Sequence, residues 1–317
     1  MKGVFLDLNT VDRNDLDLSA LQGTLSEWRM YRQSLPENLH DMIADAEILV
    51  TNKVVLDERA LASAQQLQLI CIAATGTNNV DLQTTARRGV VVCNALAYAT
   101  TSVVEHVFAL ILALSRRLPE YQRAIDAGAW QQSTEFCLLD FPIRELSGQT
   151  IGIIGGGELG HSVSRLAQAL GMRVLLAERR GEKPRPGRAV FEAVLRQSDV
   201  ISIHCPLTPK TRGLIGIAEL AQMKPNALLI HTSRGGIVDE TALRNALDSG
   251  HLGGAAVDVL SNEPPNNGNP LLDTGLPNLI ITPHIAWASR TARQRLIDEI
   301  AENIRGFLAG RPRNRVN

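Results

Sequence analysis

Three stretches in the second half of the chain carry side chains that could reduce a carbonyl group. Arg234 follows one apolar strand, Glu263 precedes two prolines, and His284 follows the last apolar strand. Hydride delivered to a ketone leaves an oxygen that needs a proton, which a histidine can donate near neutral pH. A neighbouring carboxylate favours the imidazolium form, and a guanidinium can hold a substrate carboxylate and polarise the adjacent carbonyl. Each residue alone has an ordinary structural explanation, but together they predict carbonyl reduction.

A glycine-rich turn in the middle of the chain indicates where the hydride comes from. The apolar strand 151–154 leads into the three glycines of a G-x-G-x-x-G turn, namely Gly155, Gly157 and Gly160. The first allows a tight turn, the second lets the backbone approach a pyrophosphate, and the third lets a helix pack on the strand. The helix that follows presents its positive end to phosphates. The order of strand, turn and helix therefore predicts a dinucleotide-binding site.

The residue that follows the next strand, 173–177, bears on the choice of cofactor. Glu178 lies at the offset of a carboxylate that binds the adenosine ribose, and it should repel a 2′-phosphate. Arg179 and Arg180 come directly after it and partly offset that repulsion. We expect NADH to be preferred with some use of NADPH, and an equal or reversed catalytic efficiency would contradict this.

The composition limits the class of protein. The 317 residues exceed one ordinary core and suggest two domains, and 32 basic against 33 acidic residues leave no excess charge for nucleic acid or an anionic membrane. The four cysteines are scattered without metal-ligand spacing, so neither a zinc site nor a disulfide framework is expected. The N-terminus lacks a signal-peptide pattern, and the longest apolar run, 107–114, is too short to span a membrane. These features predict a cytoplasmic protein whose partner is a small molecule.

Alternating strand and helix patterns predict two domains with parallel sheets. In about the first 97 residues, strands are expected at 4–8, 48–50, 69–73 and 90–93, and helices at 16–25, 38–44 and 57–64. A central block repeats the alternation from 151 to 282. The amphipathic helix from Ser289 follows the last central strand, so we expect it to pack on the N-terminal domain. The expected fold class is α/β with two Rossmann-like doubly wound sheets: residues 1–98 and 287–317 form a substrate-binding domain, and residues 99–286 an NAD-binding domain.

The segment between these blocks has two parts. Ser102 and Glu105 make a capping-box pattern, which predicts the start of a long and largely apolar helix that ends near residue 118. Beyond residue 123 the pattern dissolves into a loop with Trp130 and Phe136, which suits an interface or the rim of an active site. This loop either caps the active site of a second subunit or packs within its own domain.

With these motifs in place, the chain resembles the D-isomer-specific 2-hydroxyacid dehydrogenases, and among them it is similar to bacterial hydroxypyruvate reductases. The resemblance spans nearly the whole chain and rests on an ordered set of motifs: 51–53, 73–81, 102–106, the glycine turn, 204–208, 232–236, 258–265 and 283–284. It implies reduction of a short 2-keto acid to the D-2-hydroxy acid with NADH, in particular hydroxypyruvate to D-glycerate, with glyoxylate as a secondary substrate. It also implies two domains that close on a cleft and a homodimer held through the nucleotide domain.

The same resemblance assigns roles to individual residues. Arg234 anchors the substrate carboxylate and carbonyl, Glu263 tunes the histidine, and His284 donates the proton. The substrate is also bound by four residues of the N-terminal domain: Asn52, Ala74, Thr75 and Gly76. Beside the three glycines, Arg234 and His284, the implied cofactor-binding residues are Glu158, Leu159, Glu178, Arg179, Cys205, Pro206, Thr208, Thr232, Ser233 and Asp258. Asp258 would hold the nicotinamide carboxamide.

Three positions depart from the family pattern, and several alternatives stay open. His231 stands where Asn is common, Ser233 replaces Ala, and Glu178 replaces Asp, so the rate and its pH dependence could differ from those of the family. Phosphoglycerate dehydrogenase and 2-ketogluconate reductase are alternative activities, whereas formate dehydrogenase would need Gln where Glu263 stands. An alternative of another class is an NAD(H)-sensing binding protein like a transcriptional corepressor, which detectable turnover would exclude.

Overall fold

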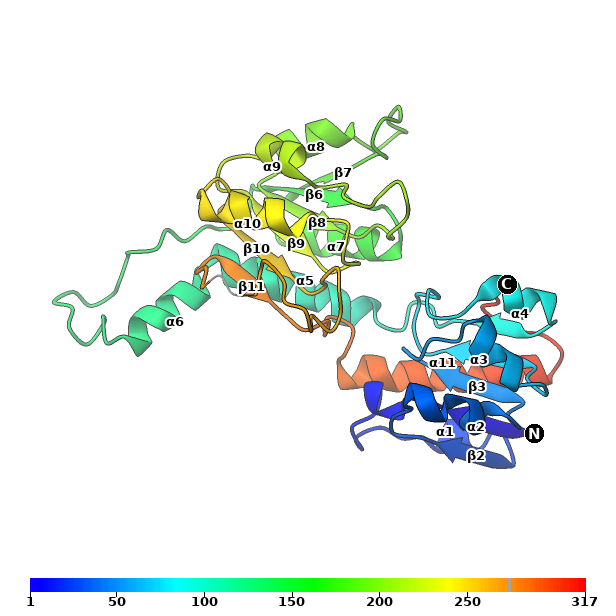
Figure 1. Ribbon diagram of the computed structural model, residues 1–317. Coiled ribbons are helices and arrows are strands. Elements are labelled where there is room, and N and C mark those ends of the chain that lie inside the picture. The colour runs from blue at the N-terminus through cyan, green and yellow to red at the C-terminus, as the bar shows by residue number, and fades with distance from the viewer. Residues whose placement is uncertain (273–274) are drawn as a thin grey trace. The chain divides into compact units, whose positions relative to one another are not determined.

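The computed structural model describes residues 1–272 and 275–317 and divides the chain into two compact units. Unit 1 consists of Met1–Ala99 and Trp287–Asn317, and unit 2 of Thr100–Ala286 (Figure 1). Each unit is a parallel sheet covered by helices. This confirms the expected α/β class with two Rossmann-like sheets.

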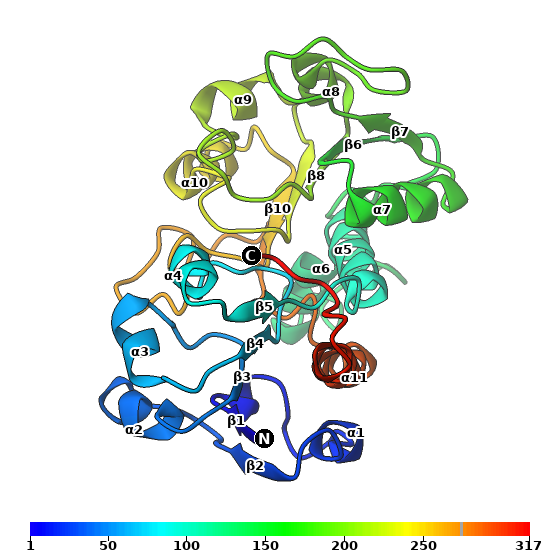
Figure 2. The same ribbon diagram turned by 90° about the vertical axis from the view of Figure 1, so that its right-hand side faces the viewer.

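The sheet of unit 1 has the strand order β2-β1-β3-β4-β5, with every pair parallel. Its strands are β1 (Lys2–Phe5), β2 (Glu27–Met30), β3 (Ile48–Thr51), β4 (Leu69–Ile72) and β5 (Val91–Cys93). Its helices are α1 (Ser19–Gln22), α2 (Leu39–Ile43), α3 (Glu58–Ser63), α4 (Leu82–Arg87) and α11 (Arg290–Leu308), with 3-10 turns at Leu8–Thr10 and Pro36–Asn38. Figure 2 shows α2, α3 and α4 on one face of the sheet and α1 and α11 on the other.

Two apolar cores follow from the alternation of side chains along these strands. Val4 and Leu49 belong to the core under α2 and α3, whereas Phe5 and Ile48 belong to the core under α11. The buried stripe of α11 completes the second core with Leu296, Ile297, Ile300 and Ile304. The expectation that the last helix packs on the N-terminal sheet is therefore confirmed.

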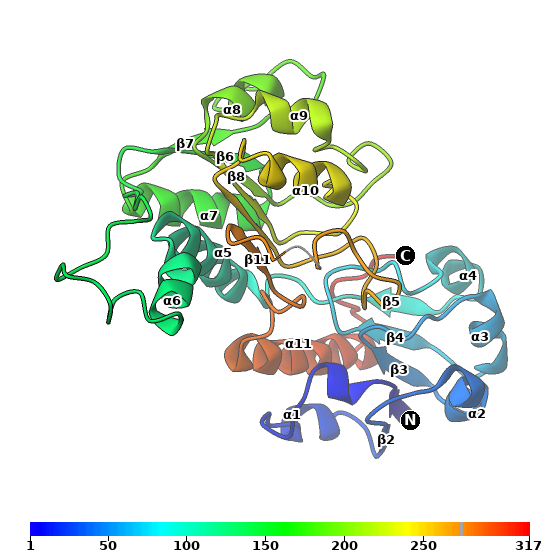
Figure 3. The same cartoon turned by 60° about the vertical axis from the view of Figure 1, so that its left-hand side comes forward.

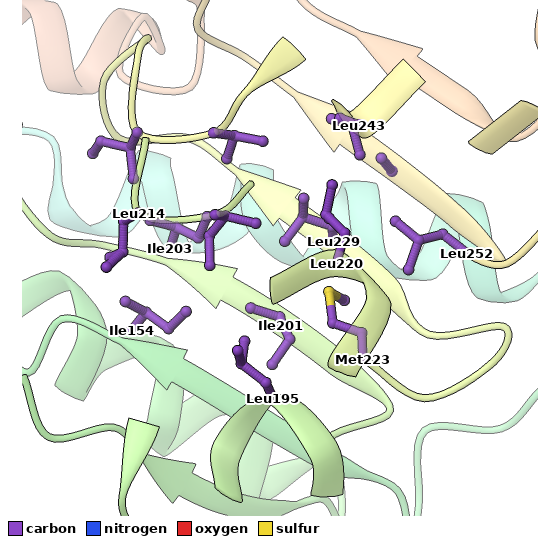
Figure 4. Close-up of a cluster of buried hydrophobic side chains, with 14 of the residues drawn as sticks. Ile154, Leu195, Ile201, Ile203, Leu214, Leu220, Met223, Leu229, Leu243 and Leu252 are labelled. Atoms are coloured by element: carbon purple, nitrogen blue, oxygen red, sulfur yellow. The ribbon is translucent and has the colours of Figure 1, made fainter. Parts of the chain in front are cut away.

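The sheet of unit 2 has the order β11-β10-β9-β8-β6-β7 and is also parallel throughout. Its strands are β6 (Thr150–Ile154), β7 (Arg173–Leu176), β8 (Val200–Ile203), β9 (Leu228–His231), β10 (Gly254–Val257) and β11 (Leu279–Ile281). Its helices are α5 (Thr100–Ser115), α6 (Leu118–Asp126), α7 (Glu158–Ala169), α8 (Phe191–Gln197), α9 (Ile217–Gln222) and α10 (Glu240–Asp248). Figure 4 shows the core on one face, where Ile201, Leu220 and Leu229 meet.

Some elements differ from the sequence-based expectation. The strand β2 and the helices α4 and α6 were not predicted, and β2 is a half-exposed edge strand in which Glu27 and Arg29 alternate with Trp28 and Met30. The predicted capping box at Ser102 is wrong because α5 begins at Thr100, and the Ser102 hydroxyl donates to the carbonyl of Ala286 at 2.8 Å. This contact ties the first turn of α5 to the end of the segment that carries His284.

Candidate active site

The glycine turn is built as a dinucleotide site requires. Gly155 follows β6 with a φ of +109°, which L side chains rarely adopt. A Cβ on Gly160 would overlap the carbonyl oxygen of Gly155, whereas a Cβ on Gly157 would meet open space. α7 begins at Glu158, with Leu159 in its first turn and without a side-chain cap, so its first N–H groups are left for a ligand such as a phosphate. The residues present here fit a dinucleotide.

The carboxylate of Glu178 is held by the loop that follows β7. Glu178 is 2% exposed and accepts hydrogen bonds from Nε and Nη2 of Arg185, both at 2.6 Å. The backbone N–H groups of Arg179 and Arg185 add bonds of 2.9 and 3.2 Å, so each oxygen accepts two. The hydrogen bonds from Arg185 are the largest cause that holds the pKa of Glu178 well below its ordinary value. Where the sequence predicted a contact with ribose, the structure shows a closed ion pair.

Arg234 lies on a segment that touches the loop bearing Glu263. A Cβ on Gly235 would overlap the carbonyl of Leu260, so the glycine allows the two segments to meet. Arg234 Nη1 donates to the carbonyl of Ser233 at 2.7 Å, and the N–H of Leu260 donates to Glu263 Oε1 at 2.8 Å. Both segments follow the carboxyl ends of neighbouring strands, β9 and β10, where ligands bind in such sheets.

Glu263 and His284 form a direct pair. The distance from Glu263 Oε2 to His284 Nδ1 is 2.6 Å, and both side chains are partly exposed. Because Nδ1 faces the carboxylate, Nε2 is the ring nitrogen that remains to donate a proton to a substrate. The structure therefore brings together the predicted proton donor and its carboxylate partner.

His284 is held in a rare backbone conformation by Asp258. His284 has a φ of +56°, and its N–H donates to the Asp258 carbonyl at 2.9 Å. The N–H groups of Ile285 and Ala286 donate to the Asp258 carboxylate, both at 2.9 Å, and the Thr282 hydroxyl donates at 2.5 Å. Asp258 is 1% exposed. Here it shapes the histidine loop, whereas the family resemblance implied a contact with the nicotinamide carboxamide.

Two further side chains belong to this network, although the sequence gave them no role. His106 Nε2 lies 3.1 Å from the Thr282 hydroxyl and 3.6 Å from Asp258 Oδ1. His106 comes from α5, and Thr282 follows β11. The motif 102–106 was a signal for His106, but only the folded structure shows which groups it meets.

The remaining predicted cofactor residues lie after β8 and β9. Cys205 is half-buried, and Thr208 is exposed and bonded through its hydroxyl to that of Thr211 at 3.0 Å. The carbonyl of Pro206 accepts from Thr211 at 2.6 Å, which closes this turn. The buried Thr232 hydroxyl has no hydrogen-bond partner within residues 1–272 and 275–317, so it could bond to a ligand. Ser233 Oγ lies 3.4 Å from His231 Nδ1.

We expect His231 to make unit 2 sensitive to acid. Burial is the main cause that lowers the pKa of this histidine to about 4, against an ordinary value of 6.5. The unfolded chain therefore binds a proton more readily than the fold, so stability is lost as the pH falls from about 6.5 towards 4. Between about pH 7.5 and pH 5, the free energy of unfolding should fall about 2 kcal/mol less in His231→Asn than in the wild type.

Urea denaturation followed by circular dichroism at both pH values measures this difference. The control is His40→Asn, which removes a half-buried histidine on α2 of the other unit. An identical pH dependence in the wild type and in His231→Asn would show that the buried imidazole does not contribute.

The predicted substrate residues of unit 1 follow β3 and β4. The side chain of Asn52 donates to Thr10 Oγ1 at 3.0 Å. The loop of Ala74, Thr75 and Gly76 is fixed through Thr75, whose hydroxyl donates to the carbonyl of Ala95 at 2.8 Å. The carboxyl ends of these two adjacent parallel strands thus carry the residues expected to bind the substrate carboxylate.

Asp7 holds the segment that contains Asn52. Its carboxylate is 5% exposed and accepts from the N–H groups of Asn52 at 2.9 Å, Lys53 at 2.6 Å and Val54 at 3.3 Å. Burial raises the pKa of Asp7, although these backbone donors oppose that shift. No sequence pattern pointed to this contact because Asp7 and Asn52 are 45 residues apart.

Replacing Asp7 with asparagine should weaken substrate binding more than catalysis. An amide offers one acceptor oxygen, so at least one buried N–H of residues 52–54 loses its partner, at a cost of about 1–3 kcal/mol in stability. We expect KM for the keto acid to rise about tenfold or less, with kcat and NADH affinity retained. Steady-state kinetics test this against Asp57→Asn, which removes an equivalent charge at the N-cap of α3. A fall in kcat with an unchanged KM would contradict the positioning role.

The loop beyond α6 carries the exposed aromatic residues. The indole N–H of Trp130 donates to the carbonyl of Phe136 at 3.0 Å, whereas the Phe136 ring is 90% exposed. Figure 3 shows the segment after α6 extending away from the sheet of its own unit. Trp130 is thus tied to its own loop, and Phe136 and Leu139 leave apolar surface open.

Among the helices of residues 1–272 and 275–317, none combines the length and apolar character that crossing a membrane demands. The same residues contain no group of three or more His, Cys, Asp and Glu side chains placed to bind a metal ion.

Comparison with known proteins places the chain in a family. The family model described as D-isomer specific 2-hydroxyacid dehydrogenase, NAD binding domain, matches residues 108–286. The chain is 44% identical over 306 residues to a glycerate dehydrogenase of Methylorubrum extorquens, with 96% of each covered. It is 37% identical over 324 residues to a hydroxypyruvate reductase of Blautia hydrogenotrophica, with all of both covered. The structure of D-lactate dehydrogenase from Aquifex aeolicus with NAD and lactic acid matches with a TM-score of 0.81 and 29% identity, covering 97% of this chain and 96% of that one. The chain therefore belongs to the D-isomer-specific 2-hydroxyacid dehydrogenases, NAD-binding oxidoreductases that act on CH–OH donors.

Proposed function

We propose that the protein reduces hydroxypyruvate to D-glycerate, with glyoxylate as a secondary substrate. The observation that carries this proposal is the 2.6 Å pair of Glu263 and His284, which stands in the same unit as the dinucleotide turn. The relatives named glycerate dehydrogenase and hydroxypyruvate reductase, which match over nearly the whole chain, support the choice of substrate. In this proposal, unit 1 is the substrate-binding domain and unit 2 the NAD-binding domain.

In this proposal each residue of the site has a different role in the reaction. Arg234 of unit 2 holds the substrate carboxylate and polarises the neighbouring carbonyl. The substrate-binding residues that we propose for unit 1 are Asn52 and the backbone of residues 74–76. When bound, the reduced nicotinamide supplies the hydride to the carbonyl carbon. His284 donates a proton from Nε2 to the carbonyl oxygen, so that C=O becomes CH–OH. Glu263 holds the ring through Nδ1 and stabilises its protonated form before the transfer.

A substrate panel tests the proposal. NADH consumption is measured with hydroxypyruvate, glyoxylate, pyruvate, 2-ketogluconate and 3-phosphohydroxypyruvate, and the chirality of the product is determined. Hydroxypyruvate should give the highest kcat/KM, with D-glycerate as the product. A higher value for the phosphorylated acid or for 2-ketogluconate would select one of the alternative activities. If NADH binds but no substrate turns over, the interpretation as an NAD(H)-sensing binding protein replaces the enzyme.

We further propose that the protein is a cytoplasmic homodimer whose subunits associate through the loop after α6. Burying the exposed ring of Phe136 would contribute about 1.5–3 kcal/mol. Phe136→Ser should therefore raise the dimer dissociation constant about tenfold or more, as measured by analytical ultracentrifugation. The control Ile217→Ser changes an exposed apolar residue on α9 of the same unit. A wild type that is monomeric, or equal effects of the two changes, would refute this interface.

A further inference from the structure

The loop between β7 and α8 concentrates positive charge beside the glycine turn. Residues 178–188 contain five basic side chains and two acidic ones, a net charge of +3, whereas the whole chain has a net charge of −1. The basic residues are Arg179, Arg180, Lys183, Arg185 and Arg188, and the acidic ones are Glu178 and Glu182. Such a local excess favours an anionic ligand.

Arg188 lies across the ends of two neighbouring strands. Its guanidinium rests on Gly156, where a Cβ would come within 2.5 Å of Nη2, and its Nη1 donates to the carbonyl of Ala177 at 3.3 Å. Gly156 belongs to the turn after β6, and Ala177 directly follows β7, the parallel neighbour of β6. The adenosine ribose of a dinucleotide lies at this place in Rossmann-type sheets, and an arginine there can accommodate a 2′-phosphate.

Glu178, the carboxylate that would repel a 2′-phosphate, is paired with Arg185. Arg185 grips the Glu178 carboxylate with two hydrogen bonds of 2.6 Å, and both oxygens are already filled. Arg188 Nε lies 3.9 Å from Glu178 Oε2, and Arg179 Nη1 lies 3.9 Å from Glu182 Oε1, so both are loose ion pairs beyond hydrogen-bond distance. The Arg188 guanidinium therefore lies at the expected ribose position, with Arg179 in the same loop, while the Glu178 carboxylate is held by Arg185.

We infer that Arg188, with Arg179 beside it, binds the 2′-phosphate of NADP(H), and that Arg185 enables this by holding Glu178 away from the ribose. The protein then binds NADP(H) more tightly than NAD(H), in place of the NADH preference expected from Glu178 alone. This inference rests on the proposed reductase function and specifies the form of cofactor that the same site takes.

The test uses two nucleotides that differ only in the 2′-phosphate, adenosine 5′-monophosphate and adenosine 2′,5′-diphosphate. Isothermal titration of the full chain should show that the diphosphate binds about tenfold or more tightly than the monophosphate. In Arg188→Ala this ratio should fall close to one, with monophosphate binding retained. Neither ligand contains nicotinamide or a keto acid, so the result does not depend on which substrate the protein reduces.

A matched control separates the effect of the position of Arg188 from the effect of removing one positive charge from the loop. Arg180→Ala removes the same charge from the same loop, but Arg180 is paired with Glu219 of α9 at 2.7 Å, so the ratio should stay at the wild-type value. If the affinity ratio falls equally in Arg188→Ala and Arg180→Ala, the loop attracts the 2′-phosphate only through its overall positive charge, and the inference is overturned. A wild-type ratio of one or below would overturn it as well.

A second variant tests the part played by Arg185. In Arg185→Ala the Glu178 carboxylate loses its two strongest partners and is released to accept from ribose hydroxyls and to repel a 2′-phosphate. The diphosphate should then bind more weakly than in the wild type, while the monophosphate binds equally or more tightly. Retained monophosphate binding also shows that the loop is still folded. An unchanged ratio would contradict the role of this ion pair.

Discussion

His284→Ala is expected to lower kcat for keto-acid reduction by about 10²- to 10⁴-fold, the range that a positioned general acid contributes. The ring is oriented by Glu263 at 2.6 Å, and its backbone is held at a φ of +56° by three N–H groups that donate to Asp258. A water molecule that fills the space left by the ring is neither oriented by Glu263 nor fixed to the backbone, so it is a poorer proton donor. NADH should still bind to the variant, although His284 is one of the implied cofactor-binding residues, because the glycine turn follows β6 and the histidine follows β11. Titration of NADH fluorescence checks this.

The control for this prediction is His40→Ala, the same change of side chain on α2 of the other unit, which should leave kcat unaltered. Retention of more than about a tenth of the wild-type kcat in His284→Ala would mean that another group supplies the proton. A loss of NADH binding together with activity would instead indicate that the substitution disturbs the loop held by Asp258.

Much of the fold could be predicted because its signals are local. Buried strands such as β3 and β9 each begin with three apolar residues in a row, and α11 shows its apolar stripe at helical spacing. The strand β2 was missed because its four residues are polar or half-exposed at the sheet edge, where burial imposes little pattern. The capping box failed because the Ser102 hydroxyl has a partner at Ala286, which lies 184 residues away.

The site was predictable in its residue types but less so in their partners. Glu263 and His284 were predicted as partners and are paired. Glu178 and Asp258 were predicted to bind the cofactor, which stays a prediction, and the structure adds the partners within the chain that hold each carboxylate. Such contacts depend on how a loop folds back against the end of a strand, and the spacing of apolar residues in the sequence does not predict this. The same holds for Asp7, whose contact with Asn52 exists because β1 and β3 are neighbours in the sheet.

Arg234→Lys is expected to lower kcat/KM for hydroxypyruvate by about 10- to 10²-fold, the loss of one charged hydrogen bond, although it keeps the charge. A planar guanidinium can bind a carboxylate through two parallel hydrogen bonds, each worth about 1.5–3 kcal/mol, and an ammonium cannot reproduce that fork. Gly235 allows the Arg234 segment to pack against the backbone of Leu260, which fixes the position of the Arg234 backbone. The matched control is Arg244→Lys on α10, where the arginine pairs with Asp248 on the same helix.

The substrate itself can separate carboxylate binding from other roles of Arg234. Hydroxyacetone has the same carbonyl and hydroxyl groups as hydroxypyruvate but lacks the carboxylate. The wild type should have a much higher kcat/KM for hydroxypyruvate than for hydroxyacetone. Arg234→Ala should lose most of that difference, because without the guanidinium the acid is reduced hardly faster than hydroxyacetone. Guanidinium ion added to Arg234→Ala should restore part of the activity with the acid and none with hydroxyacetone. If both substrates lose activity equally, Arg234 acts on the carbonyl or on the loop, and the carboxylate is bound elsewhere, with the loop at residues 74–76 as the next candidate.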